Sequence, residues 1–165
     1  MRRFLPELQD ENEADLTVVN AENAAGGFGV TAGVLEEFLE QSEIDVLTSG
    51  NHIWDKREAL DLIQDEPRLL RPHNYPEDTP GSGWIVATAS NGVRVGVLNI
   101  MGTVFMHPTL DCPFSSANLA IEKKPSDVHA ILVDFHAEAT SEKVAMGWYL
   151  DGSVSAVVGT HTHVP

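Results

Sequence analysis

Polar side chains of the kinds that bind metal ions stand directly after four short apolar stretches of the chain. They are Glu22, Asn23, Asn51, His52, His136, His161 and His163. Glu and Asn offer oxygen, His offers nitrogen, and none of the seven is a thiol. Mixed oxygen and nitrogen sites suit Mn²⁺, Fe or Zn²⁺ and can keep positions open for catalysis. The pattern therefore predicts a catalytic metal centre.

The residue types also suggest individual roles. The carboxylate of Glu22 can bridge two metal ions, and Asn51 can give its amide oxygen to one. His161 and His163 are two residues apart, so in extended backbone both imidazoles point to the same side, towards neighbouring metals. His52 would lie beside Asn51, free to hydrogen-bond to a substrate or to protonate it.

The elements that must position these residues alternate between strands and helices. We expect buried strands at 16–20, 45–49, 130–135 and 156–159, and helices at 31–41, 55–63, 116–123 and 141–150. Thr31 is the expected N-cap of the first of these helices, and Asp55 with Glu58 resembles a capping box for the second. Residues 84–89 and 93–100 flank an Asn-Gly pair, which predicts a β-hairpin.

This alternation favours an α/β fold with a largely parallel, covered sheet and one added hairpin. The carboxyl ends of parallel strands lie on one edge of a sheet, where ligands bind. The four polar clusters are therefore expected to converge there, although they are far apart in sequence.

Length and composition restrict the class of protein. The 165 residues are 42% hydrophobic with a formal net charge of −15, which predicts one domain over residues 1–165 with a real core. Acidic excess argues against a nucleic-acid polymer as partner. No apolar run is long enough to span a membrane, and the N-terminus lacks a signal peptide, so we expect a cytoplasmic protein without a membrane partner. The single cysteine, Cys112, excludes an internal disulfide.

Simpler explanations apply to other polar residues. A single histidine is usually not a ligand, and His73, His107 and His129 are interpreted in that way. Asp134 could orient a metal-bound imidazole or pair only with backbone or solvent. Glu142 is interpreted as a helix N-terminal charge, whereas Glu138 keeps both that explanation and a supporting role beside the metal.

The motifs together resemble the calcineurin-like metallophosphoesterase superfamily, and more closely its bacterial dinuclear-metal cyclic-nucleotide phosphodiesterases. The motifs are Val19-Asn-Ala-Glu-Asn-Ala24, Ser49-Gly-Asn-His-Ile-Trp-Asp55, Asp134-Phe-His-Ala-Glu-Ala-Thr-Ser-Glu-Lys143 and Val158-Gly-Thr-His-Thr-His-Val164. The resemblance implies an α/β/β/α sandwich that binds two divalent transition-metal ions, usually Fe or Mn, with Zn as an alternative. It also implies hydrolysis of a small phosphodiester, a 2′,3′- or 3′,5′-cyclic nucleotide, by metal-activated hydroxide.

The resemblance also implies individual roles. Glu22 would bridge the two metals, and His52 would be the proton donor. The ligands of the first metal would include Asn23 and His163, and those of the second would be Asn51, His136 and His161.

One departure from the family pattern keeps an alternative open. The family begins with a strand ending in Gly-Asp, whose Asp binds the first metal, and it continues with further strands after the His-x-His motif. This chain is therefore expected to be a fragment, truncated at both ends. The alternatives are an inactive metal-binding or regulatory module of the same family, or a phosphomonoesterase or protein phosphatase. Homo-oligomer formation is also open.

Overall fold

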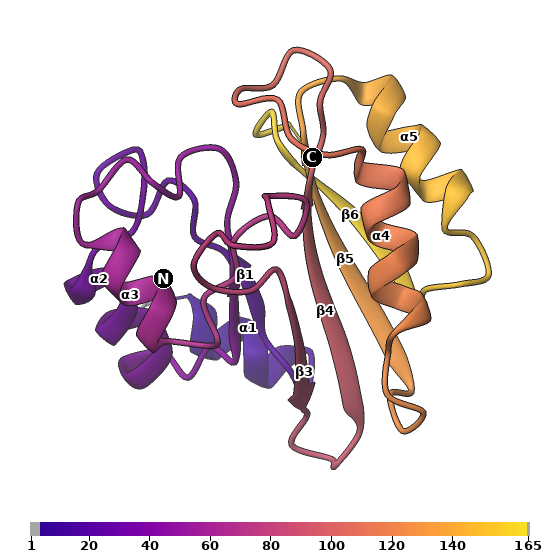
Figure 1. Cartoon of the computed structure of the whole chain (residues 1–165). Coiled ribbons are helices and arrows are strands. Elements are labelled where there is room, and N and C mark those ends of the chain that lie inside the picture. The colour runs from indigo at the N-terminus through magenta and orange to yellow at the C-terminus, as the bar shows by residue number, and fades with distance from the viewer. Residues whose placement is uncertain (1–3, 165) are drawn as a thin grey trace.

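Residues 4–164 are described by the computed structural model (Figure 1). Strands and helices alternate along most of their length. The elements are α1 (Leu5–Glu11), β1 (Val18–Asn20), α2 (Ala32–Glu36), the π-helix η1 (Glu37–Gln41), β2 (Val46–Thr48), α3 (Ala59–Asp65), β3 (Trp84–Thr88), β4 (Arg94–Met101), α4 (Pro113–Glu122), β5 (Ala130–Ala137), α5 (Thr140–Tyr149) and β6 (Ala156–His161).

The strands form two sheets. In the four-stranded sheet, of order β3-β4-β5-β6, β3 and β4 make the predicted hairpin and β4, β5 and β6 run parallel. The small sheet pairs β1 with β2 in parallel, and Leu69 bridges to Leu47 on the other side of β2. Within the large sheet, His136 stands opposite Thr160 in the ladder. The carboxyl ends of β1, β2, β5 and β6 therefore supply the residues singled out by sequence.

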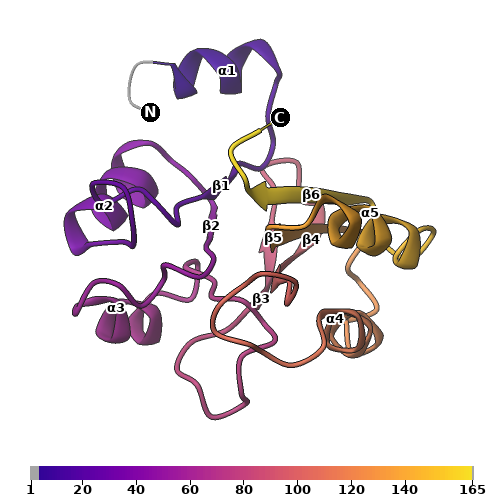
Figure 2. The same ribbon diagram turned by 90° about the horizontal axis from the view of Figure 1, so that it is seen from above.

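Three apolar cores separate four layers. One core fills the space between the large sheet and α4 and α5, and another lies between the small sheet and α2, η1 and α3. A smaller core, with Val46, Leu70 and Val97 at its centre, joins the two sheets. Helices therefore cover the outer side of each sheet (Figures 1 and 2), which confirms the expected α/β/β/α arrangement.

Some local expectations need correction. The strand expected to be buried at 156–159 is β6, but it lies at the edge of the described sheet and none of its residues is buried. The prediction of a capping box at Asp55 and Glu58 is wrong, because α3 begins only at Ala59. Glu58 instead accepts a hydrogen bond from the backbone N of Ala32, in the first turn of α2. Thr31 does cap α2, because its hydroxyl accepts from the backbone N of Val34. No helix between residues 4 and 164 is long and apolar enough to cross a membrane.

Candidate metal centre

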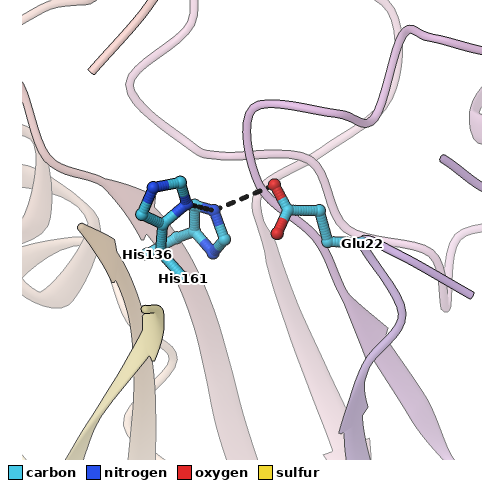
Figure 3. A group of neighbouring side chains, drawn as sticks. All are labelled: Glu22, His136 and His161. Carbon is cyan, nitrogen blue, oxygen red and sulfur yellow. Dashed lines mark hydrogen bonds and ion pairs between the residues drawn. The ribbon is translucent and has the colours of Figure 1, made fainter. Parts of the chain in front are cut away.

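Glu22, His136 and His161 converge at the carboxyl edge of the strands, where the two sheets face each other (Figure 3). Glu22 follows β1, His136 lies near the end of β5 and His161 ends β6. One ligand atom from each lies within 4.8 Å of the other two. Glu22 and His136 are buried, at 1% and 0% exposure, and His161 is partly exposed. Two of the three candidate ligands are thus buried, and solvent reaches the third.

The Nε2 atom of His136 lies at the centre of this group. It is 2.9 Å from Oε1 of Glu22, 3.0 Å from Oδ1 of Asn51 and 3.1 Å from Nδ1 of His161. A ring nitrogen carries at most one hydrogen, so it can donate to only one of the three. Hydrogen bonding alone therefore does not explain this convergence.

The same distances suit ligands of one metal ion. Ligands about 2.1 Å from a transition metal and at right angles to each other lie about 3.0 Å apart. The donor set of one carboxylate, one amide oxygen and two imidazoles is of the mixed type that Mn²⁺, Fe or Zn²⁺ accepts. Glu22, Asn51, His136 and His161 therefore fit one metal ion. Three of them, Asn51, His136 and His161, are the ligands expected for the second metal, and Glu22 is the expected bridging ligand.

The backbone beside His136 is built for close approach. A Cβ added at Gly50 would lie 2.2 Å from Nε2 of His136, closer than real Cβ contacts allow. Gly50 immediately precedes Asn51 and follows β2, so its missing side chain lets the loop carry Asn51 against the imidazole. The Asn99 side chain fixes the same loop, because it bonds both backbone groups of Ser49.

Asn23 and His163 form a second group on the other side of Glu22. The Nδ2 atom of Asn23 is 3.1 Å from Nε2 of His163 and 3.4 Å from Oε2 of Glu22. The two oxygens of Glu22 thus face different groups, as a bridging carboxylate would. Asn23 presents its amide nitrogen here, and an amide turned by 180° would present Oδ1 instead.

The expectation that His161 and His163 lie in extended backbone is wrong. His161 and His163 have φ angles of 93° and 56°, so the segment is not extended, and the two rings do not share a side for that reason. His161 contacts His136 and Glu138, whereas His163 contacts Asn23. The turn itself is supported by Lys143, whose Nζ donates to the Thr160 carbonyl and the Thr162 hydroxyl.

His52 touches the site through its backbone and holds its ring towards an acid. Its backbone N donates to Oε1 of Glu22 over 3.2 Å. Its Nδ1 lies 2.7 Å from Oδ2 of Asp55, and both side chains are about 40% exposed. The Phe28 ring lies 6.1 Å from the His52 ring. The contact with Asp55 uses Nδ1 and leaves Nε2 as the ring nitrogen that a ligand could reach.

The electrostatics favour deprotonated ligands. Burial raises the pKa of Glu22, but hydrogen bonding with the His136 side chain and the His52 backbone outweighs it, together with the positive charge of the two imidazoles when they are protonated, and leaves the pKa below its ordinary value. Burial lowers the pKa of His161, and the charge of His136 lowers it further. The carboxylates of Glu22 and Glu138 raise this pKa, but by less. Glu22 is therefore ionised and His161 neutral at pH 7, the states in which both bind metals.

The buried carboxylate of Asp134 joins three strands beside the candidate ligands through hydrogen bonds. Asp134, 5% exposed, accepts from the hydroxyls of Thr160 and Thr48 and from Nδ2 of Asn20, which come from β6, β2 and β1. Burial raises the pKa of Asp134, and these hydrogen bonds oppose that rise. Asp134 does not touch His136 directly, because the Thr160 hydroxyl lies between them, 3.0 Å from Nδ1.

Several supporting residues were not predicted. Asn99 is a fully buried polar residue within the apolar run of β4, and that interruption was the available signal. Thr160 gave no signal beyond its place before His161. Glu138 takes the supporting role, with its carboxylate 3.0 Å from Nε2 of His161. Glu142 is buried and accepts from the backbone N of Thr103, so it fixes a loop rather than only opening a helix.

The fold and this geometry define a mixed α/β protein with a candidate metal centre at the carboxyl edge of its strands. The chain belongs to the YmdB-like family, whose model, described as YmdB-like protein, matches residues 1–165. It is 47% identical over 164 residues to a protein of Bacillus subtilis (strain 168) named 2′,3′-cyclic-nucleotide 2′-phosphodiesterase, in a match that covers 99% of this chain and 61% of that protein.

Two solved structures have the same fold. The crystal structure of a hypothetical protein from Thermus thermophilus is 41% identical, with a TM-score of 0.89 over 99% of this chain and 62% of that one. A crystal structure described as a novel phosphatase, from Mycoplasma pneumoniae, is 34% identical, with a TM-score of 0.88 over 99% and 59%. The chain thus spans about three fifths of the length of these relatives.

Proposed function

We propose that this chain carries the metal centre of a metallophosphoesterase that hydrolyses cyclic nucleotides, with the 2′,3′-cyclic type as first candidate. The observation that carries the proposal is the convergence of Glu22, Asn51 and His161 on Nε2 of His136, all within 3.1 Å. The name of the Bacillus subtilis relative supports the substrate class.

The proposed centre holds two ions of Mn²⁺ or Fe, with Zn²⁺ as an alternative. Asn51, His136 and His161 would hold one, His163 and Asn23 would contribute to the other, and Glu22 would bridge them. Metal ions in such a pair neutralise phosphate oxygens and make a water molecule a stronger nucleophile. Metal cations at this site would also allow a chain of net charge −15 to bind an anionic substrate.

The proposed proton donor is His52. In the hydrolysis, one P–O bond to a ribose oxygen breaks and one P–O bond to a water oxygen forms, so the departing oxygen needs a proton. Asp55 holds Nδ1 of His52 over 2.7 Å, which leaves Nε2 to give that proton. General acid assistance of this kind contributes roughly 10²–10⁴ to a rate.

The test combines metal content with turnover. The purified chain, loaded with Mn²⁺ or Fe²⁺, is given bis-(p-nitrophenyl) phosphate and then 2′,3′- and 3′,5′-cyclic nucleotides. We expect turnover that falls by roughly 10²–10⁴ in His52→Ala while bound metal is retained. Equal turnover in His52→Ala would contradict the role of His52.

The same assay separates the alternatives. Bound metal without turnover would favour a metal-binding module, because the Asn23 and His163 group has only Glu22 as a carboxylate within hydrogen-bonding distance among residues 4–164. Faster hydrolysis of a phosphomonoester than of any diester would favour a phosphomonoesterase.

A further inference from the structure

The Thr160 hydroxyl connects the candidate metal ligand His136 to a buried carboxylate. Thr160 and His136 are directly opposite in the parallel ladder between β5 and β6. The Thr160 Oγ1 atom lies 3.0 Å from Nδ1 of His136 and donates to Oδ1 of Asp134 over 2.6 Å. Nδ1 is the ring nitrogen that faces away from Glu22 and Asn51, whose contacts are with Nε2.

The direction of these hydrogen bonds fixes the position of one proton. A hydroxyl has a single hydrogen, and that of Thr160 is given to Asp134. Towards His136 the same oxygen can only accept, so Nδ1 must carry the hydrogen. In a neutral imidazole with a hydrogen on Nδ1, Nε2 has a free lone pair. That lone pair faces Glu22, Asn51 and His161, where the metal ion is proposed.

Asp134 keeps the Thr160 hydroxyl in this orientation. Its carboxylate also accepts from Thr48 and Asn20, so three donors already surround it. Rotation of the Thr160 hydroxyl towards His136 would leave Oδ1 of a buried carboxylate without this partner, which is unfavourable.

We infer that Thr160 is a positioning residue, which holds the His136 imidazole as the tautomer with hydrogen on Nδ1 and so prepares Nε2 to bind a metal ion. This inference rests on the metal centre of the proposed function. The proposed ligands alone place no condition on position 160 of β6, whereas this inference requires a hydroxyl there.

Two substitutions at one position test the inference. Thr160→Val removes the hydroxyl and keeps the branched shape, whereas Thr160→Ser keeps the hydroxyl. Thr48→Val is the matched control, because it removes a hydroxyl from the same Asp134 carboxylate without touching His136. Calorimetric titration of each purified protein with Mn²⁺ gives the affinity. We expect about 10–100-fold weaker binding in Thr160→Val, the loss typical when the outer partner of a metal-bound histidine is removed.

The outcomes separate the two hypotheses. Near wild-type affinity in Thr160→Ser and in Thr48→Val, with the loss confined to Thr160→Val, supports the positioning role. Unchanged affinity in Thr160→Val, or an equal loss in all three variants, overturns it while the metal centre stands. Absence of Mn²⁺ binding to the unsubstituted protein overturns the metal centre and this inference with it.

A spectroscopic measurement gives a second, independent result. Nitrogen NMR of the histidine-labelled, metal-free protein reports which nitrogen of His136 carries hydrogen. We expect hydrogen on Nδ1 in the unsubstituted protein and in Thr160→Ser, and a smaller share of that tautomer in Thr160→Val. Neutral His136 with its hydrogen on Nε2 in the metal-free, unsubstituted protein would contradict the inference whatever the affinities are.

Discussion

Gly50→Ala places a methyl group where the structure has no room for one. The new Cβ would lie 2.2 Å from Nε2 of His136, 2.4 Å from Cδ2 and 2.5 Å from Cε1, whereas ordinary contacts begin at 3.4 Å. The imidazole or the loop must therefore move by about 1.2 Å. Metal ligands tolerate displacements of only about 0.2 Å, so His136 can no longer bind in its place.

Gly50→Ala is expected to weaken metal binding and to lower stability. Loss of this ligand weakens Mn²⁺ binding on the order of 100-fold or more, beyond the effect of removing an outer partner. Overpacking beside the buried ring lowers the free energy of unfolding by about 1–3 kcal/mol. Calorimetric titration measures the first quantity and urea unfolding without metal measures the second.

Gly147→Ala is the matched control. Gly147 lies within α5, and a Cβ there meets nothing within 4 Å. We expect unchanged Mn²⁺ affinity and a gain of roughly 0.5–1 kcal/mol, because Ala is the better helix former. If Gly50→Ala bound Mn²⁺ as tightly as the unsubstituted chain, Nε2 of His136 would not be a ligand, and the reasoning from the convergence of side chains would be refuted.

Three further results are expected. Mn²⁺ at a free concentration of 100 times its dissociation constant should raise the free energy of unfolding by about 2.7 kcal/mol, reversibly with a chelator, and an unchanged melting curve would contradict specific binding. Thr48→Val should lower the free energy of unfolding by about 1–3 kcal/mol because it removes a donor from buried Asp134, whereas Thr88→Val on the exposed end of β3 should change it by less than about 0.5 kcal/mol. Hydrogen bonds from Arg68 hold the pKa of Glu66 below its ordinary value of 4.5, so the pair stabilises the fold above that pH and loses the contribution as the pH falls through the lowered pKa. Arg68→Gln removes this pair and should lower the free energy of unfolding by at most about 1 kcal/mol at pH 7, because the pair is partly exposed. The loss should be smaller at pH 3. An equal loss at both pH values would show that it does not come from the ionised Glu66 carboxylate.

The order of elements could be predicted because each signal is local. The Asn91-Gly92 pair places the hairpin between β3 and β4, and apolar runs place the parallel strands. Parallel pairing of β5 with β6 brings their carboxyl ends to one edge, which is why His136 and His161 could be expected side by side from sequence. Glu22 follows β1 in the other sheet, so it reaches them only through the packing of the two sheets.

The supporting contacts depend on how the two sheets face each other, and no local pattern contains that information. Asp134 meets Asn20 and Thr48 only because the small sheet packs against the large one. Asp55 gave a false helix signal, since an acid three residues after His52 pairs with the imidazole in this loop. The positive φ angle of His161 likewise has no local signal in the sequence.

Anomalous X-ray diffraction from crystals of this chain grown with Mn²⁺ tests the metal centre most directly. We predict a peak bonded to Nε2 of His136, Oδ1 of Asn51, Nδ1 of His161 and a carboxylate oxygen of Glu22, with a second peak beside His163 if the centre is dinuclear. Crystals that contain Mn²⁺ but show no anomalous peak within bonding distance of His136, with the four side chains still in place, would contradict the account.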